Sequence, residues 1–260
     1  MNKDFLIIPD RKHINECLNL AKEYNLGFEY NDFFMPDLLD DEERLEGLIS
    51  EYRRHELPEY TTIHGDFFDV IPFSMDSRIR EISDLRIKQS IDVARRIGAK
   101  AVIMHTNYNP FLNTKQYIKS WIEQNVRYWG KILEENKDIN IYLENMFDAS
   151  PDIMEELSEH LKDYSNYGLC LDYAHAAISN VEPQIWAKQL GRFVKHVHIN
   201  DNDRVSDLHQ AWGDGLIDRD TFYDSYDRYM KGATVLIETN PMDNKIRSLE
   251  LMEKEGFIRR

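Results

Sequence analysis

Residues 168–199 read GLCLDYAHAAISNVEPQIWAKQLGRFVKHVHI and contain one complete strand–helix–strand unit. Residues 168–172 and 194–199 are short, largely apolar segments of the kind that forms parallel strands buried on both faces. Residues 183–190 lie between them and have the pattern of an amphipathic helix. This order predicts two parallel strands joined by a right-handed helical crossover.

The same alternation continues along the chain in both directions. Further strands are predicted at residues 5–8, 27–30, 61–64, 101–105, 139–143 and 234–238. Further helices are predicted at residues 14–24, 41–55, 79–97, 115–136, 152–162, 220–230 and 245–254. We find no Ser/Gly linker and no break in composition, which indicates one domain over residues 1–260. Strands and helices in this alternation predict an α/β fold, a single-domain (β/α)8 TIM barrel with its active site at the C-terminal ends of the strands.

Residues at the predicted helix ends support these boundaries. Gly27 and Gly98 follow helices at positions where a left-handed residue often ends the last turn. Ser150, Pro151 and Asp152 have the order expected of an N-cap, a first helical residue and an acid in the first turn. Asp218 or Asp220 is expected to cap the helix predicted at residues 220–230.

The composition narrows the classes of partner. The 260 residues are 42 % hydrophobic, and 47 acidic against 32 basic residues give a net charge of −15. Nucleic-acid binders usually carry a basic surface, so the charge disfavours such a partner and suits a small-molecule substrate. A nucleic acid is not excluded, because bound cations can create a local positive patch.

The sequence also gives expectations about location and assembly. Cys17 and Cys170 are not in a C-x-x-C pattern, so we interpret them as buried thiols of a protein in the reducing cytoplasm. The chain begins without a signal-peptide pattern, and no apolar run approaches the roughly 20 residues of a membrane span. A homo-oligomer is compatible with such a barrel.

Residues that can bind metal ions stand at or just after the ends of the predicted strands. Each of the last six strands is followed by at least one of them, which local packing does not require. A barrel brings these ends together at one rim. The candidate metal ligands are His64, His105, Glu144, Asp172, His175, His198, Asp207, His209 and Glu238.

The strongest local signals are carboxylates and histidines on buried apolar segments. Glu144 and Glu238 each come at the end of such a strand, where a carboxylate is costly unless it is paired or metal-bound. His196 and His198 alternate on one strand and therefore face the same side. We expect His198, nearer the C-terminal end, to be the ligand and His196 to support it.

Two short motifs follow the sixth and seventh strands. Asp172 and His175 form D-x-x-H, in which the two side chains can converge on one cluster. Residues 207–215 form D-x-H-x-x-x-G-D-G, in which Asp207 and His209 can aim at the same ion. The glycines of the second motif permit a tight backbone beside that ion.

The nine candidate ligands indicate how many metal ions the chain could bind. Five imidazoles and four carboxylates are too many for one ion, which takes about four to six protein and water ligands. The set is large enough for two or three ions, so we expect one to three divalent ions per chain. Ligation rich in imidazole favours zinc or manganese over magnesium or calcium.

At this level the chain resembles the xylose isomerase-like TIM barrels, over nearly its whole length. That superfamily includes sugar-phosphate isomerases and epimerases and the endonuclease IV family. In the isomerase branches one divalent ion is typically held by Glu, Asp, His and Glu from strands five to eight. The resemblance places Glu144, Asp172, His198 and Glu238 on those positions.

In the endonuclease IV branch, nine residues hold three zinc ions. The nine candidate ligands of this chain match those residues in type and order. His198-Ile199-Asn200-Asp201 and Asp207-Leu208-His209 fall in register with that branch. Residues 201–203, Asp-Asn-Asp, and residues 213–218 instead follow a stretch common in proteins labelled sugar isomerases. Loops rich in basic residues, which a nuclease would use to grip DNA, are not identifiable.

Two enzymatic hypotheses and one alternative remain open. The first is a metal-dependent isomerase or epimerase acting on a small sugar, polyol or sugar phosphate, in which Glu144 and Glu238 move a proton next to a metal-bound carbonyl. Surface charge and the Asp-Asn-Asp stretch favour it, and it is the function that the sequence predicts. The second is a zinc-dependent phosphoesterase of the endonuclease IV type, acting on abasic DNA or a smaller ester, and the ligand inventory favours it. A metal-binding barrel without catalysis is the alternative.

Overall fold

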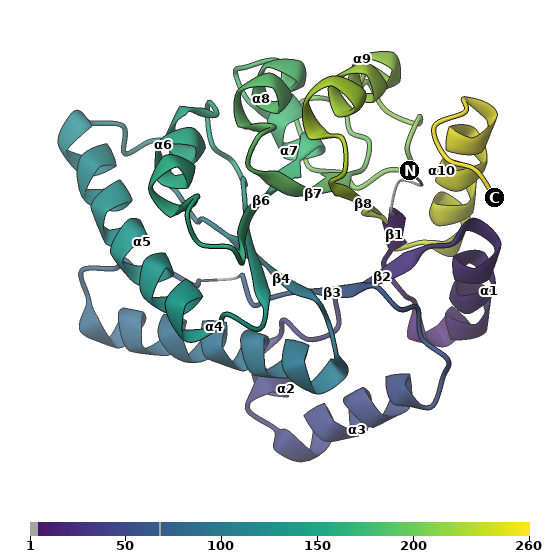
Figure 1. Ribbon diagram of the computed structural model, residues 1–260, viewed down its shortest axis with the longest axis horizontal. Helices are drawn as coiled ribbons and strands as arrows, with labels where there is room; N and C mark the ends of the chain where they lie inside the picture. Colours follow the sequence, from purple (N-terminus) through teal and green to yellow (C-terminus); the bar gives the residue numbers. More distant parts are fainter. Residues whose placement is uncertain (1–4, 68) are drawn as a thin grey trace.

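The computed structural model describes residues 5–67 and 69–260 and contains a closed barrel of parallel strands in the order β1 to β8 (Figure 1). The predicted (β/α)8 barrel is therefore confirmed. The strands are β1 (Phe5–Ile7), β2 (Gly27–Tyr30), β3 (Thr61–His64), β4 (Ala101–His105), β5 (Asn140–Glu144), β6 (Tyr167–Asp172), β7 (Val194–Ile199) and β8 (Thr234–Ile237).

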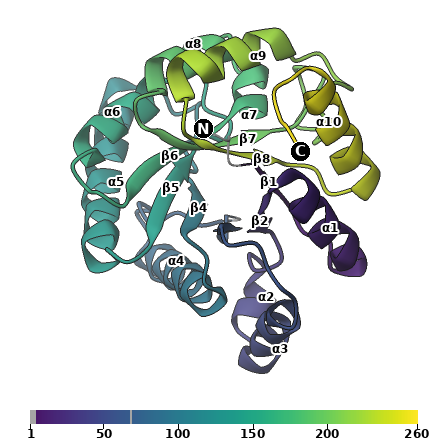
Figure 2. The same ribbon diagram turned by 45° about the vertical axis from the view of Figure 1, so that its right-hand side comes forward.

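The helices surround the ring of strands, as the turned view in Figure 2 also shows. They are α1 (Ile14–Tyr24), α2 (Pro36–Leu39), α3 (Glu42–Arg53), α4 (Ser77–Ile97), α5 (Lys115–Glu135), α6 (Asp152–Leu161), α7 (Tyr173–Ile178), α8 (Pro183–Leu190), α9 (Arg219–Ser225) and α10 (Met242–Lys254). A 3-10 turn (Arg11–His13) precedes α1, and a π turn (Tyr226–Met230) continues α9. The short helices α2 and α7 were not predicted from the sequence.

Successive strand side chains point to opposite faces, alternately out toward the helices and into the barrel. Outward residues such as Ile141, Leu143 and Val197 belong to the large core between the strands and the helices. Inward residues form two much smaller apolar clusters, one around Ala101, Ile103, Tyr142 and Cys170 and one around Leu6, Ile8 and Leu236. The barrel interior is therefore only partly apolar.

The strand register sets which inward side chains lie next to one another. His105 is paired with Glu144, Glu144 with Cys170, and Cys170 with His196. A shift in register between Leu169 and Cys170 produces this last pairing and places Asp172 beside His198. The polar inward residues of β4 to β7 thus form a continuous set near the C-terminal ends of the strands.

The helix ends correct two of the predictions. Asn25, with φ of 53°, ends α1, and Gly27 lies instead in β2, where a Cβ atom would come within 2.4 Å of the Tyr60 carbonyl oxygen. Ser150 does not cap α6, since its hydroxyl donates to the Asp152 carboxylate.

The other two expected helix ends are as predicted. Gly98 ends α4 with φ of 83°. Asp218, rather than Asp220, caps α9 by accepting a hydrogen bond from the Thr221 amide. Within the described part of the chain, no helix combines the length and apolar character needed to cross a membrane.

Candidate metal centre at the barrel rim

All nine predicted ligands lie together at the C-terminal end of the barrel. Side chains from β3, β4 and β5 form one set of potential ligands, His64, His105 and Glu144. A second set from β6, β7 and the end of β8 comprises Asp172, His198 and Glu238. Within each set one ligand atom per residue lies within 4.8 Å of the others, which is the crowding expected around an ion.

Glu144 occupies the centre of the cluster and joins the first two sets. Its Oε2 atom lies 3.4 Å from His64 Nε2 and 3.2 Å from His105 Nε2. Its Oε1 atom lies 3.2 Å from His198 Nδ1, which is also 3.5 Å from Glu238 Oε2. One buried carboxylate can therefore bridge two ions.

A third set comprises His175, in the short helix α7, and Asp207 and His209, in the loop after β7. His175 Nε2 and His209 Nε2 are 3.4 Å and 3.1 Å from the same oxygen of Asp207, Oδ2. His209 adopts a left-handed backbone conformation, with φ of 47°. Such a conformation is unfavourable outside glycine and is often found at functional sites, so the loop is constrained to present this imidazole to the cluster.

Three of these histidines are oriented by main-chain carbonyl groups. His64 Nδ1 lies 3.0 Å from the Gly65 carbonyl, His175 Nδ1 lies 2.9 Å from that of Asn145, and His209 Nδ1 lies 3.2 Å from that of Glu238. A carbonyl oxygen only accepts, so each Nδ1 carries the proton when the ring is neutral. Each Nε2 atom is left with a free lone pair facing the carboxylates, which is the arrangement typical of metal-binding histidines.

The loop that carries Asp207 and His209 is held by Asp201. Its carboxylate accepts hydrogen bonds from the amides of Asn202, Gly213 and Ile217, at 2.9, 2.9 and 3.1 Å. Gly213 has φ of 98°, and a Cβ atom on Gly215 would come within 2.4 Å of the Asp201 carboxylate. Both positions therefore require glycine, as predicted from the motif. The Asp-Asn-Asp stretch contributes Asp201, whose carboxylate holds the loop in place.

Buried polar atoms without hydrogen-bond partners indicate a metal site independently of any family resemblance. Among the described residues, the buried atoms Glu144 Oε1, Glu144 Oε2, Asp172 Oδ2, His198 Nδ1 and Asp207 Oδ1 have no hydrogen-bond partner. Buried polar atoms are rarely left without partners because each costs about 1–3 kcal/mol. Divalent ions would satisfy all of them, and a donor set of imidazoles and carboxylates fits zinc or manganese.

Protons offset part of the negative charge when no cation is bound. Burial raises the pKa of Asp172 to about 7, so this carboxyl group is partly protonated near neutrality. Burial opposes ionisation of Glu144 as well, but His198 and His105 hold its pKa well below the usual value. Burial would lower the pKa of His209, but the hydrogen bond with Asp207 and the charge of Glu238 raise it to about 10.

This protonation predicts a pH-dependent affinity for the third set. A proton must leave His209 before its Nε2 can bind a metal ion, so affinity should rise with pH up to about 10, by about tenfold per pH unit for each proton displaced. Zinc titrations from about pH 6 to about pH 9 would measure the slope. His209→Ala should lose one ion and flatten the slope, and His160→Ala, on the exposed face of α6, should change neither. A slope that is unaltered in His209→Ala would show that this histidine is not a ligand.

Sequence reasoning missed Glu29, a carboxylate buried inside the barrel on β2. Its oxygens lie 3.1 Å from His196 Nε2 and 3.1 Å from His198 Nε2, on the side of His198 away from the rim. The signal was present, because a glutamate in the buried strand Gly27–Tyr30 is as costly as Glu144 is after β5. His196, predicted to support His198, lies beside it beneath the rim.

A cavity of about 290 Å³ opens directly onto the cluster. Phe34, Phe67 and Phe147 supply aromatic walls around the histidines and carboxylates, and none of the described residues that line it is lysine or arginine. When the lining histidines are neutral, as metal ligands are, an anionic substrate in this cavity must obtain its positive partners from bound cations. The remaining lining residues are Asn31, His64, His105, Met146, His175, Asp207, His209, Glu238 and Asn240.

The chain is similar to known proteins over most of its length. A family model described as xylose isomerase-like TIM barrel matches residues 18–255. A protein of Mycobacterium leprae named probable endonuclease 4 is 28 % identical over 218 residues, which cover 76 % of this chain and 79 % of that protein.

Two solved structures share the fold at lower identity. A D-tagatose 3-epimerase-like protein superposes with a TM-score of 0.76 and 22 % identity, over 98 % of both chains. A Thermus thermophilus protein soaked with ZnCl2 gives a TM-score of 0.76 and 21 % identity, over 99 % of this chain and 100 % of that one. At such identities the likeness establishes the barrel and leaves the reaction open.

Proposed function

Because this chain belongs to the xylose isomerase-like TIM barrel family, we propose that it is a phosphoesterase that uses up to three divalent ions to hydrolyse a small phosphate ester. The observation that carries this proposal is the division of the nine donors into three adjoining sets around Glu144, Asp172 and Asp207. A single-ion enzyme would need only Glu144 and the three residues of the second set, Asp172, His198 and Glu238. It would have no evident use for the other five donors, which are His64, His105, His175, Asp207 and His209.

The net charge of the site, with carboxylates and metal ions counted together, differs between one bound ion and three. Four carboxylates, Glu144, Asp172, Asp207 and Glu238, contribute −4 when ionised, and the cavity wall offers no lysine or arginine among its described residues. When only the carboxylates and the ions are counted, one dication leaves −2, so the site has no net positive charge to attract a phosphate ester. Three dications leave +2, which attracts it.

Each set has a distinct part in this proposal. His64, His105 and Glu144 would hold one ion, Glu144, Asp172, His198 and Glu238 a second, and His175, Asp207 and His209 a third. Ions in such an arrangement supply Lewis acidity, a water of lowered pKa and a clamp on both reacting oxygens. The protein fixes the carboxylates and imidazoles in place through the carbonyl bonds of His64, His175 and His209.

The cavity argues for a small substrate. A volume of about 290 Å³ accommodates a small ester, and Phe34, Phe67 and Phe147 supply apolar surface around it. The net charge of −15 and the absence of basic side chains among the described lining residues disfavour a long polyanion. Because the Mycobacterium relative is named an endonuclease, and because the sequence resembles the endonuclease IV family, abasic DNA is the first comparison substrate rather than the expected one.

The experiment is a hydrolysis assay on zinc- or manganese-loaded protein with a small chromogenic phosphodiester, phosphomonoesters and an abasic duplex. We expect turnover of a small ester that chelation abolishes and metal restores. His209→Ala should lose this activity, and His160→Ala should keep it. A fully metal-loaded protein with no activity on any of these esters would contradict the proposal.

A second candidate, a sugar isomerase or epimerase, is favoured by one specific feature. Glu144 and Glu238 both lie close to His198 Nδ1, at 3.2 and 3.5 Å, so two carboxylates are available beside the ion that a substrate carbonyl would bind. Either could remove a proton next to the carbonyl while the other returns it. Solvent deuterium appearing at carbon in a ketose panel, measured by NMR, would identify this reaction and is not expected from a phosphoesterase.

A further inference from the structure

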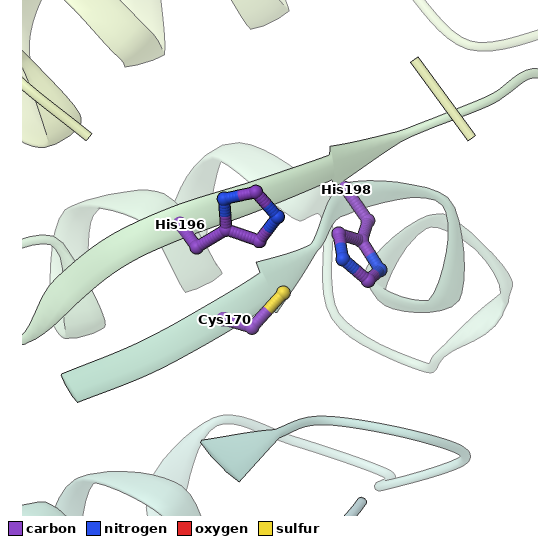
Figure 3. Close-up of side chains that lie close together, drawn as sticks. All are labelled: Cys170, His196 and His198. Atoms are coloured by element: carbon purple, nitrogen blue, oxygen red, sulfur yellow. The ribbon is translucent and has the colours of Figure 1, made fainter. Parts of the chain in front are cut away.

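A second group of potential ligands lies inside the barrel, beneath the rim cluster. Figure 3 shows Cys170 on β6 with its sulfur directed toward the two imidazoles of His196 and His198 on β7. One ligand atom from each of these residues lies within 4.8 Å of the others, and all three residues are at most 1 % exposed. Glu29, equally buried, reaches the same place from β2.

The contacts of Glu29 have the spacing of ligands around a common centre. Its Oε2 atom is 3.1 Å from His196 Nε2, and its Oε1 atom is 3.1 Å from His198 Nε2. Neighbouring oxygen and nitrogen ligands of a tetrahedral zinc ion lie about 3.3 Å apart. Within the described residues, however, Glu29 Oε1, His196 Nε2 and His198 Nε2 form no hydrogen bond of acceptable geometry. The atoms are thus close together without being aligned on one another.

Neighbouring hydroxyl groups orient two of these ligands. The Thr234 hydroxyl donates to the Lys195 carbonyl, so its oxygen is free to accept from His196 Nδ1 at 2.5 Å. The proton of a neutral His196 is therefore on Nδ1, which leaves a lone pair on Nε2. Thr62 donates to Glu29 Oε2 at 2.6 Å and fixes the carboxylate. Supporting bonds of this kind are typical of metal ligands.

We propose that Glu29, Cys170, His196 and His198 form a buried tetrahedral site for one zinc ion, separate from the rim ions. The Cys170 thiol loses its proton to solvent as the zinc–sulfur bond forms, so a thiolate and a carboxylate balance the two charges of the ion. Charges that are largely balanced in this way are suited to a buried position. Four protein ligands without an open position indicate a structural ion.

His198 connects this site to the rim. Its Nε2 atom faces Glu29, and its Nδ1 atom faces Glu144 and Glu238. With both positions occupied the ring is an imidazolate bridge, and the dications on either side favour loss of its second proton. The buried ion would thereby fix the angle at which His198 meets the rim.

Cobalt is a suitable probe, because thiolate-bound Co²⁺ has a sulfur-to-metal charge-transfer absorption that nitrogen and oxygen ligands do not give. Wild-type protein refolded with Co²⁺ should show this band. Cys170→Ser should lose the band and one equivalent of metal. Cys17→Ser should keep both, since Cys17 is buried elsewhere, with its sulfur 3.4 Å from the sulfur of Met242.

The wild-type spectrum decides the matter even if Cys170→Ser fails to fold. A cobalt-loaded protein that fills its rim sites and shows no thiolate band would overturn the proposal, as would a band that survives in Cys170→Ser. Neither result decides the phosphoesterase proposal, which the hydrolysis assay on the rim residues tests separately.

Discussion

Replacing Glu144 with glutamine is expected to abolish the chemistry of the site. The two oxygens of Glu144 serve different sets, with His64 and His105 near Oε2 and His198 near Oε1. The amide keeps the size of the side chain but removes its charge and one acceptor. We expect the loss of at least one rim ion and a decrease in turnover of about a thousandfold or more, equivalent to about 4 kcal/mol.

Elemental analysis and kinetics on the same preparation measure both effects. Glu123→Gln makes the same chemical change on the exposed face of α5 and should match the parent in metal content and rate. A Glu144→Gln protein that retains the full complement of ions would contradict the bridging role. Retained ions with lost turnover would instead assign the carboxylate to proton transfer, as in the isomerase hypothesis.

Removing the metal ions is expected to destabilise the fold strongly. Glu144, Asp172 and Glu238 are buried around His198, and without cations their charges are offset only by protons. Each ion present at 100 times its dissociation constant stabilises the folded state by about 2.7 kcal/mol, so three contribute about 8 kcal/mol. For a domain of this size that corresponds to a decrease in Tm of roughly 15 °C or more.

Thermal unfolding before and after dialysis against a chelator tests this expectation. Adding back zinc should restore the original Tm, whereas magnesium, which prefers oxygen ligands, should restore little of it. A Tm that does not change on chelation would mean that the cluster is satisfied without ions, contrary to its unpaired buried atoms.

The fold was predictable because each strand carries a local signal. Short apolar segments alternate with longer amphipathic ones, and that alternation requires a parallel sheet covered by helices. The predicted strand ends differ from the observed ones by at most one residue, whereas α10 begins three residues before its predicted start. Such differences arise because pairing with neighbours, rather than local sequence, sets the ends. Helix α7 was missed because Asp172, already assigned as a ligand, also accepts the His175 amide as its N-cap.

The location of the candidate ligands was predictable for the same reason, since a barrel brings all the C-terminal strand ends to one rim. The grouping of the ligands into sets was not, because it depends on side-chain directions and on the register of β6 and β7. Glu29 was overlooked because it lies within a strand rather than at its end. The role of Asp201 depends on amides up to 16 residues away, which no local pattern reveals.

The most direct test of the account is to locate the ions in crystals of untagged protein purified without added metal or chelator. Diffraction data on either side of the zinc and manganese absorption edges would identify each ion by its anomalous scattering. The account predicts three peaks at the rim, one in each set of ligands around Glu144, Asp172 and Asp207. A single rim peak, held by Glu144, Asp172, His198 and Glu238, would contradict it and make the isomerase hypothesis the leading one.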